Sequence, residues 1–227
     1  MKQCFNLCLT FETMFYIEKE KNISVVIMDT DKPAIPEKIK ERLYPVVLRQ
    51  FSKKDFHAVN IRDISKDSGI STGTIYKYFS SKEDLLFSII DEKLRDLASL
   101  MRLHLSGTED IREMFRKLFW VTMDFFDKNP DLAVTEFITV PMKSFMASKS
   151  YKRESELDIL NEVVEKAKAK GAVMSEIENI YFADLYMMIT QRHIQNWYVH
   201  GMKWKLADTI NNFFDFFWKV ITPLGEK

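Results

Sequence analysis

The 227-residue chain has 33 basic and 33 acidic residues, and 46% of its residues are hydrophobic, which is typical of a neutral, soluble globular protein. No apolar run approaches the roughly 20 residues of a membrane span, so the pattern excludes a helical membrane protein and no membrane partner is expected. The two cysteines, Cys4 and Cys8, form neither a disulfide framework nor a zinc-binding pattern. Their scarcity fits the reducing environment of the cytoplasm.

The first 27 residues lack the charged and apolar regions of a signal peptide. Met28 is a plausible natural start of translation. Residues 1–33 are therefore expected to be a disordered extension or the product of a mis-assigned start, and the first folded domain is expected to begin at residue 34.

The first expected helix spans about residues 36–52. An apolar residue occurs at every fourth position: Ile39, Leu43, Val47 and Phe51. Pro45 lies inside this pattern and is expected to kink or split the helix, because proline lacks a backbone N–H. Asp55 follows the helix and tolerates the left-handed conformation better than most residues do.

Two short helices joined by a tight turn are expected within residues 60–86. Asn60 caps the first helix, Gly69 supplies a positive φ at the turn, and Ser71 caps the second helix, Thr72–Phe79. This arrangement describes a helix-turn-helix, whose second helix enters the major groove of DNA. Residues 36–82 hold ten Lys or Arg and five acidic residues, a net charge of +5 that favours phosphate binding.

The remaining apolar patterns all have a helical period, and none alternates as a strand does. They predict helices over residues 82–105, 109–129, 130–148 with a break at Pro141, 151–170, 177–200 and 207–221. The fold class is therefore all-α, with a three-helix DNA-binding domain over residues 34–82 and a larger helical domain over residues 83–227.

The last two helices are apolar on more than one face. One stripe of the first of them is Ile180, Ala183, Met187, Thr190, Ile194 and Trp197, and a second stripe is Phe182, Tyr186, Ile189, His193, Asn196 and His200. A helix that is apolar on two faces is buried on both sides, and a partner subunit would cover the second face. The pattern favours a homodimer formed through the last two helices, packed as a four-helix bundle. A buried hairpin within one chain is the alternative.

The segment Leu43–Leu86 resembles the DNA-binding domain of the tetracycline-repressor (TetR) family. The matching residues are Phe51, Ile61, Ile64, Gly69, Ile70, Ser71, Thr74, Ile75, Tyr76, Phe79, Lys82 and Leu85. The resemblance implies a homodimeric transcriptional regulator that binds a pseudo-palindromic operator in double-stranded DNA. It also implies a ligand cavity inside the C-terminal helices, where a bound effector changes the spacing of the two DNA-binding domains.

The resemblance also supplies candidate site residues. The DNA-binding candidates are Asn60, Arg62, Ser71, Thr72, Gly73, Thr74, Tyr76, Lys77, Tyr78 and Lys82. The ligand-binding candidates are mostly apolar or aromatic, which suits a small apolar effector: His104, Phe115, Phe119, Met123, Phe126, Phe137, Met142, Phe145, Tyr186, Gln191, His193, Asn196 and Trp197. The expected function is that of a repressor which leaves its operator when the effector binds.

Two alternative functions are compatible with the residues. One is a helical metal-dependent hydrolase that uses His193, His200 and Asp184, and the other is a constitutive DNA-binding protein without an effector. The sequence contains no Gly-rich phosphate loop, HExxH motif or nucleophile elbow. Carboxylates such as Glu136, Glu156 and Asp184 are scattered over helices, as solvated faces require. We therefore expect no catalytic residue, no metal site and no cofactor.

Overall fold

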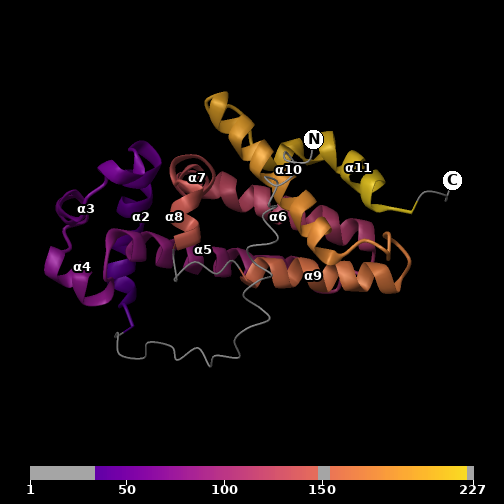
Figure 1. Ribbon diagram of the computed structural model, residues 1–227, viewed down its shortest axis with the longest axis horizontal. Coiled ribbons are helices and arrows are strands. Elements are labelled where there is room, and N and C mark those ends of the chain that lie inside the picture. The colour runs from indigo at the N-terminus through magenta and orange to yellow at the C-terminus, as the bar shows by residue number, and fades with distance from the viewer. Residues whose placement is uncertain (1–33, 148–153, 224–227) are drawn as a thin grey trace, which may run out of the picture. The chain divides into compact units, whose positions relative to one another are not determined.

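The computed structural model describes residues 34–147 and 154–223, and the expectation for residues 1–33 lies outside that range. Every regular element in the described range is helical (Figure 1). The elements are α2 (Glu37–Lys53), η1 (Phe56–Ala58), α3 (Ile61–Ser68), α4 (Thr72–Tyr78), α5 (Lys82–Leu105), α6 (Ile111–Lys128), α7 (Pro130–Val134), η2 (Thr135–Thr139), α8 (Met142–Ala147), α9 (Glu154–Ala169), α10 (Asn179–Val199), η3 (Leu206–Thr209) and α11 (Ile210–Ile221). Of the three η segments, η2 is a π-helical turn and the other two are 3₁₀ turns.

The first three α-helices pack together as a small unit, which we call the head (α2, α3 and α4, with η1). Figure 1 shows these helices side by side, next to the start of α5. Phe51 of α2, Ile64 of α3 and Ile75 of α4 are almost completely buried at the centre of this unit. Burial of apolar side chains from all three helices is what holds such short helices in place.

Pro45 and Asp55 of the head bear on two expectations from the sequence. Helix α2 runs without a break through Pro45, so the proline does not split it. Pro45 lies on the exposed side of α2, where the carbonyl that loses its hydrogen bond can reach water. Asp55 has φ −55° and ψ 138°, so it is not left-handed; the chain leaves α2 through an extended Lys54 and enters η1 directly.

The remaining helices form what we call the body (α5 to α11). Helix α6 lies at its centre and packs against α5, α9, α11 and η3. Its inner face carries Phe115, Phe119, Met123 and Phe126, and each of these side chains is almost completely buried. The helical apolar pattern predicted for residues 109–129 therefore packs at the centre of the body.

The segment after α6 shows the break expected at Pro141, but it is less regular before that break than the helix expected from Pro130. Helix α7 lasts five residues and passes into η2, and α8 begins only after Pro141. The η2 turn contacts both α2 of the head and α10 of the body, and Thr135 Oγ1 donates to the carbonyl of Leu48 at 3.3 Å. A π-helical turn inserts one extra residue per turn, so the side chains before and after it face different neighbours.

The two apolar stripes predicted for α10 do not form an inner and an outer face. Six residues drawn from both stripes are buried within the chain: Phe182, Ala183, Tyr186, Thr190, Ile194 and Trp197. The end of the second stripe, Asn196 and His200, is not buried. The large apolar side chains that do face outward are Ile180, Tyr181, Met188, Tyr198 and Val199 of α10, with Phe216 and Val220 of α11.

Within the part of the chain that the structure describes, no helix is both long enough and apolar enough to cross a membrane.

Candidate nucleic-acid interface and effector site

The ends of α3 and α4 are capped as the sequence predicted. The Asn60 side chain accepts a hydrogen bond from the backbone N–H of Asp63 at 2.9 Å, and Ser71 Oγ accepts one from the N–H of Thr74 at 3.1 Å. Gly69 closes α3 with φ 67°. Such caps satisfy backbone donors that a short helix leaves free, so they fix the two helices around a defined turn.

The outward face of α4 carries the side chains that the sequence placed in the major groove. Lys77 and Gly73 are exposed, while Thr72 and Thr74 are half-buried. The two tyrosines differ, because Tyr76 is 55% exposed whereas Tyr78 is half-buried against the core. Tyr76 is thus the freer of the two to reach DNA.

Several basic side chains of the head have no ion-pair partner in the described chain, whereas the acidic side chains near them are bonded to other residues. Among the described residues, Arg62, Lys66 and Lys77 form no ion pair. The nearby acids are engaged, since Asp63 pairs with Lys54 at 3.4 Å and Asp67 accepts a hydrogen bond from Gln50. The face formed by α3 and α4 therefore keeps available cations, which suits a polyanion.

Three DNA-binding candidates use their side chains inside the head. Lys82 Nζ donates to the carbonyls of Phe56, His57 and Val59 at 2.9 to 3.2 Å. The side chains of Asn60 and Ser71 serve as the helix caps. These three side chains hold the head together, and only their helix N-terminal backbone N–H groups remain for a phosphate.

Part of the predicted effector lining forms one aromatic cluster between α6, α10 and α11. The ring of Phe119 lies 4.7 Å from that of Tyr186, 5.0 Å from Phe213 and 4.9 Å from Phe217. The hydroxyl of Tyr186 is hydrogen-bonded to Thr122 and also donates to the carbonyl of Leu118. This cluster is tightly packed core between neighbouring helices.

A second group of candidates gathers around η2 and α8. The rings of Phe126 and Phe137 are 5.2 Å apart, and those of Phe87 and Phe145 are 5.1 Å apart. Met123 is fully buried one turn before Phe126 on the same face of α6. These side chains come from α5, α6, η2 and α8, so several separate elements converge there.

Most of the remaining ligand candidates lie outside these two groups. His104, Met142, Gln191 and Asn196 are exposed, so the structure does not bring these four together with the aromatic rings of either group. Two more have structural partners in the body. The indole N–H of Trp197 donates to the carbonyl of Trp204 at 2.8 Å, and the ring of His193 lies 4.2 Å from that of Phe213.

Comparison with known proteins identifies the head. Residues 47–89 match the model of the bacterial regulatory proteins of the tetR family, a range that holds the helix-turn-helix described above. The head is a DNA-binding domain of the TetR family. It is 30% identical over 159 residues to YerO, an uncharacterised helix-turn-helix transcriptional regulator of Bacillus subtilis. That match covers 66% of this chain and 51% of YerO, so the chain spans about half the length of that relative.

Solved structures of bacterial regulators share most of the helical arrangement. The fatty acid degradation regulator FadR of Bacillus halodurans superimposes with a TM-score of 0.75 at 19% identity, covering 82% of this chain and 97% of FadR. FadR of Bacillus subtilis, solved in complex with stearoyl-CoA, has a TM-score of 0.72 at 16% identity and covers 80% and 98% of the two chains. At such identities the likeness shows the fold alone.

The metal-site alternative has no geometric support in the described part of this chain. No group of three or more His, Cys, Asp or Glu side chains is arranged to hold a metal ion within the described residues. Nδ1 of His193 and Nδ1 of His200 are hydrogen-bonded to carbonyls of their own helix. Asp184 is half-buried, and its burial raises the pKa of its carboxyl group.

Four buried polar residues in the described part of the body were not among the site candidates: Thr122, Thr135, Glu136 and Thr190. Glu136, expected on a solvated face, is buried in η2, and Thr122 is buried beside Tyr186. The expectation for Glu136 is wrong because the π-helical turn changes which side chains face inward. The burial of Thr122 follows from its four-residue spacing from Leu118 and Phe126 on the apolar face of α6. The side chain of Glu156 lies outside the described residues.

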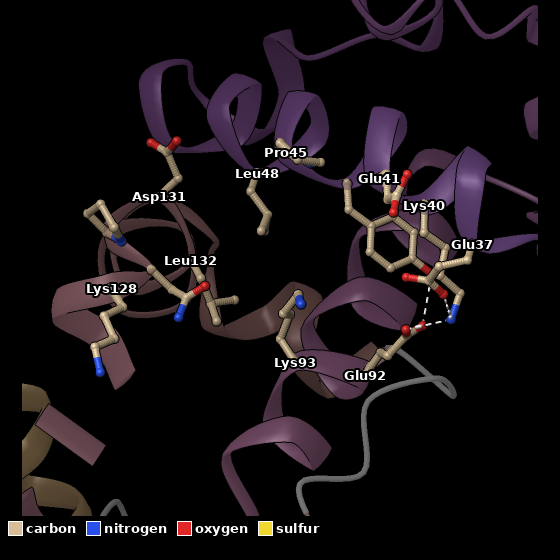
Figure 2. Close-up of a pocket in the computed structure, with 13 residues that line it drawn as sticks. Glu37, Lys40, Glu41, Pro45, Leu48, Glu92, Lys93, Lys128, Asp131 and Leu132 are labelled. Carbon is tan, nitrogen blue, oxygen red and sulfur yellow. Dashed lines mark hydrogen bonds and ion pairs between the residues drawn. The ribbon is translucent and has the colours of Figure 1, made fainter. Parts of the chain in front are cut away.

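A cavity of about 410 Å³ lies at the junction of the head and the body, between α2, α5 and the turn from α6 to α7 (Figure 2). Lys40 Nζ lies 2.6 Å from one carboxylate oxygen of Glu92, and the hydroxyl of Tyr44 donates to the other at 2.9 Å. Figure 2 shows this group at one end of the cavity and Asp131 at the other. Charged side chains from both units make this cavity unlike the apolar effector site expected from the sequence.

Proposed function

We propose that the chain is a cytoplasmic, homodimeric DNA-binding regulator of transcription, acting as a repressor that leaves a pseudo-palindromic operator when an apolar effector binds. The observation that carries this proposal is the exposed face of α3 and α4. This face carries basic side chains without ion-pair partners among the described residues, and it exposes α4, the second helix of the helix-turn-helix. The match of the head to the tetR family supports the same function.

At the DNA, the cations and the α4 side chains take different roles. Arg62 and Lys66 of α3 bind phosphates, which positions the head without reading sequence. Thr72, Lys77 and Tyr76 of α4 face the base edges. The outward face of α4 has no Arg, Asn or Gln for bidentate base contacts, so threonine contacts and DNA shape carry much of the specificity.

A dimer forms through the outward faces of α10 and α11. Tyr181, Met188 and Phe216 are each more than half exposed in the single chain. Large apolar side chains gathered on two neighbouring helices favour burial against a second copy. A two-fold dimer places the two α4 helices in major grooves about 34 Å apart, or a multiple of that distance.

The effector binds among the apolar side chains around η2 and α8, from Met123 and Phe126 to Phe137 and Phe145. Their convergence from separate elements and the contact of η2 with α2 support this location. An effector bound there shifts the population toward head positions that do not fit the operator, provided that it binds this second state more tightly. The complex of a fold neighbour with stearoyl-CoA suggests a long acyl chain as the first ligand to test.

Binding to the DNA upstream of the protein's own gene tests the DNA-binding half of the proposal. Wild-type protein is expected to bind this fragment selectively over a scrambled duplex, and Lys77→Ala should lower the affinity by about fivefold or more. Glu109→Ala, at an exposed position away from the head, is the control. Equal affinity of the wild type for both duplexes at all salt concentrations would contradict the proposal.

Titration with stearoyl-CoA tests the effector half. We expect it to release the wild-type protein from the upstream DNA and to act more weakly on Phe137→Ala, because that ring lies in the proposed site. Leu103→Ala, on the outer face of α5, should respond like the wild type. If stearoyl-CoA binds the protein without changing its affinity for DNA, the effector mechanism is wrong for this ligand class.

A further inference from the structure

The turn between α3 and α4 is held from outside by a side chain of α2. Nη2 of Arg42 donates to the carbonyl of Ser68 at 3.1 Å and to the carbonyl of Gly69 at 3.2 Å. Ser68 is the last residue of α3 and Gly69 is its C-cap. The guanidinium thus caps carbonyls that the helix leaves free, at the end where a positive charge is favourable.

Two backbone N–H groups of the turn find acceptors within α3 and its last residue. The N–H of Gly69 donates to the carbonyl of Ser65 at 2.9 Å, and the N–H of Ile70 donates to Ser68 Oγ at 3.2 Å. Ser68 is buried, so water has poor access to replace the guanidinium at that residue. Arg42 therefore supplies the donor for two carbonyls of the turn, those of Ser68 and Gly69.

Gly69 meets two separate requirements at this position. Its φ of 67° lies in the left-handed region that side chains disfavour. A Cβ added to Gly69 would also lie 2.5 Å from Nη2 of Arg42, too close for a real contact. The guanidinium of Arg42 thus occupies the space that a side chain at residue 69 would need.

We propose that Arg42 is a positioning residue for DNA recognition: it fixes the turn from which α4 leaves α3, and so sets the angle at which α4 meets the major groove. This inference rests on the proposed DNA-binding function. Because the guanidinium is directed at the turn, Arg42 acts through α4 and does not bind phosphate itself.

A double-mutant cycle on unfolding tests the contact without DNA. Gly69→Ala in an Arg42→Ala background should raise the unfolding equilibrium constant by about 5- to 30-fold, the effect of the left-handed backbone alone. In the wild-type background the increase should be larger by at least about threefold, because the new methyl group also displaces the guanidinium. Equal increases in the two backgrounds would overturn the inference.

A salt series on DNA binding tests the positioning role. Arg42→Ala should lower affinity for the upstream DNA by about fivefold or more, the cost of a misplaced base contact, with an unchanged slope of log affinity against log salt. Arg62→Ala, the control for a phosphate contact, should reduce the magnitude of that slope by about 0.9 for each phosphate that it no longer neutralises. Arg42→Lys keeps a charged donor and should recover part of the affinity.

The outcomes separate the two hypotheses. A slope change for Arg42→Ala as large as that for Arg62→Ala would make Arg42 a phosphate contact and overturn the positioning role, as would an unchanged affinity. If the wild type binds no DNA selectively, the proposed function fails and the DNA part of this inference fails with it. In that case the unfolding cycle still determines whether Arg42 holds the turn.

Discussion

The contacts that stabilise the head differ in kind from the contacts that stabilise the body. In the head, short helices depend on polar side chains that bind backbone groups: Asn60 and Ser71 as caps, Lys82 across three carbonyls, and Arg42 at the turn. In the body, long helices depend on aromatic packing around Phe119. A short helix buries little apolar surface, so the head needs defined polar contacts to keep one geometry.

The largest expected effect tests the aromatic packing of the body. Phe119→Ala should lower the free energy of unfolding by about 3–5 kcal/mol, because it leaves a cavity among closely packed rings. Leu103→Ala, with a side chain that is 68% exposed on α5, should change the free energy by less than about 0.5 kcal/mol. Urea denaturation measures both, and a small effect of Phe119→Ala would mean that the body does not depend on this cluster.

Two lysines are expected to have different roles: Lys82 stabilises the head, whereas Lys77 binds DNA. Lys82→Met should lower the free energy of unfolding by about 1–2 kcal/mol, because three carbonyls lose a charged donor at a half-buried position. Lys77→Met, on the outward face of α4, should leave stability nearly unchanged and reduce DNA affinity instead. Thermal unfolding and DNA binding of both variants test this contrast, and a loss of stability in Lys77→Met would argue against it.

Alanine substitution should change stability in opposite directions at the two glycines of the head. Gly69→Ala should destabilise the protein, and Gly73→Ala should stabilise it. A Cβ at Gly73 would meet nothing nearer than Ser71 Oγ at 4.0 Å. Gly73→Ala should therefore stabilise α4 by about 0.5 kcal/mol, because alanine is the better helix former, while the added methyl group weakens binding to DNA. A stabilised variant that keeps full DNA affinity would show that DNA does not approach α4 at Gly73.

The smallest expected effect concerns the junction between head and body. Burial opposes ionisation of Glu92, but the hydrogen bonds from Lys40 and Tyr44 outweigh it and lower the pKa of the Glu92 carboxyl. A lowered pKa in the folded state stabilises the protein above the unfolded value of about 4.3, and this stabilisation is lost as the pH falls below it. Glu92→Gln should therefore flatten the decline in stability between about pH 5 and pH 3, whereas Glu109→Gln should not.

The sequence was most informative where structure is set by neighbouring residues. The caps at Asn60 and Ser71 and the turn at Gly69 depend on side chains within three positions, so their pattern predicted the bounds of α3 and α4 to within one residue. The apolar face of α6 followed in the same way from its spacing. The match of residues 47–89 to the tetR family then rests on this locally determined segment.

The sequence was least informative where packing between distant segments decides the outcome. Pro45 was expected to kink or split α2, yet α2 is continuous through Pro45 and packs against α3, α5 and α7. The π-helical turn of η2 and the burial of Glu136 depend on contacts with α2 and α10, which are far from it in the sequence. Periodicity describes one helix at a time and carries no information on which neighbour it meets.

By itself, the sequence determined the all-α class, the helix-turn-helix and the side chains that α4 presents. Only the tertiary structure decided that Lys82, Asn60 and Ser71 hold the head together, that Arg42 reaches the carbonyls of the turn, and which faces of α10 and α11 point outward. The reason is physical: caps and turns form between residues a few positions apart, whereas the direction of a side chain depends on helices that meet only in the folded chain.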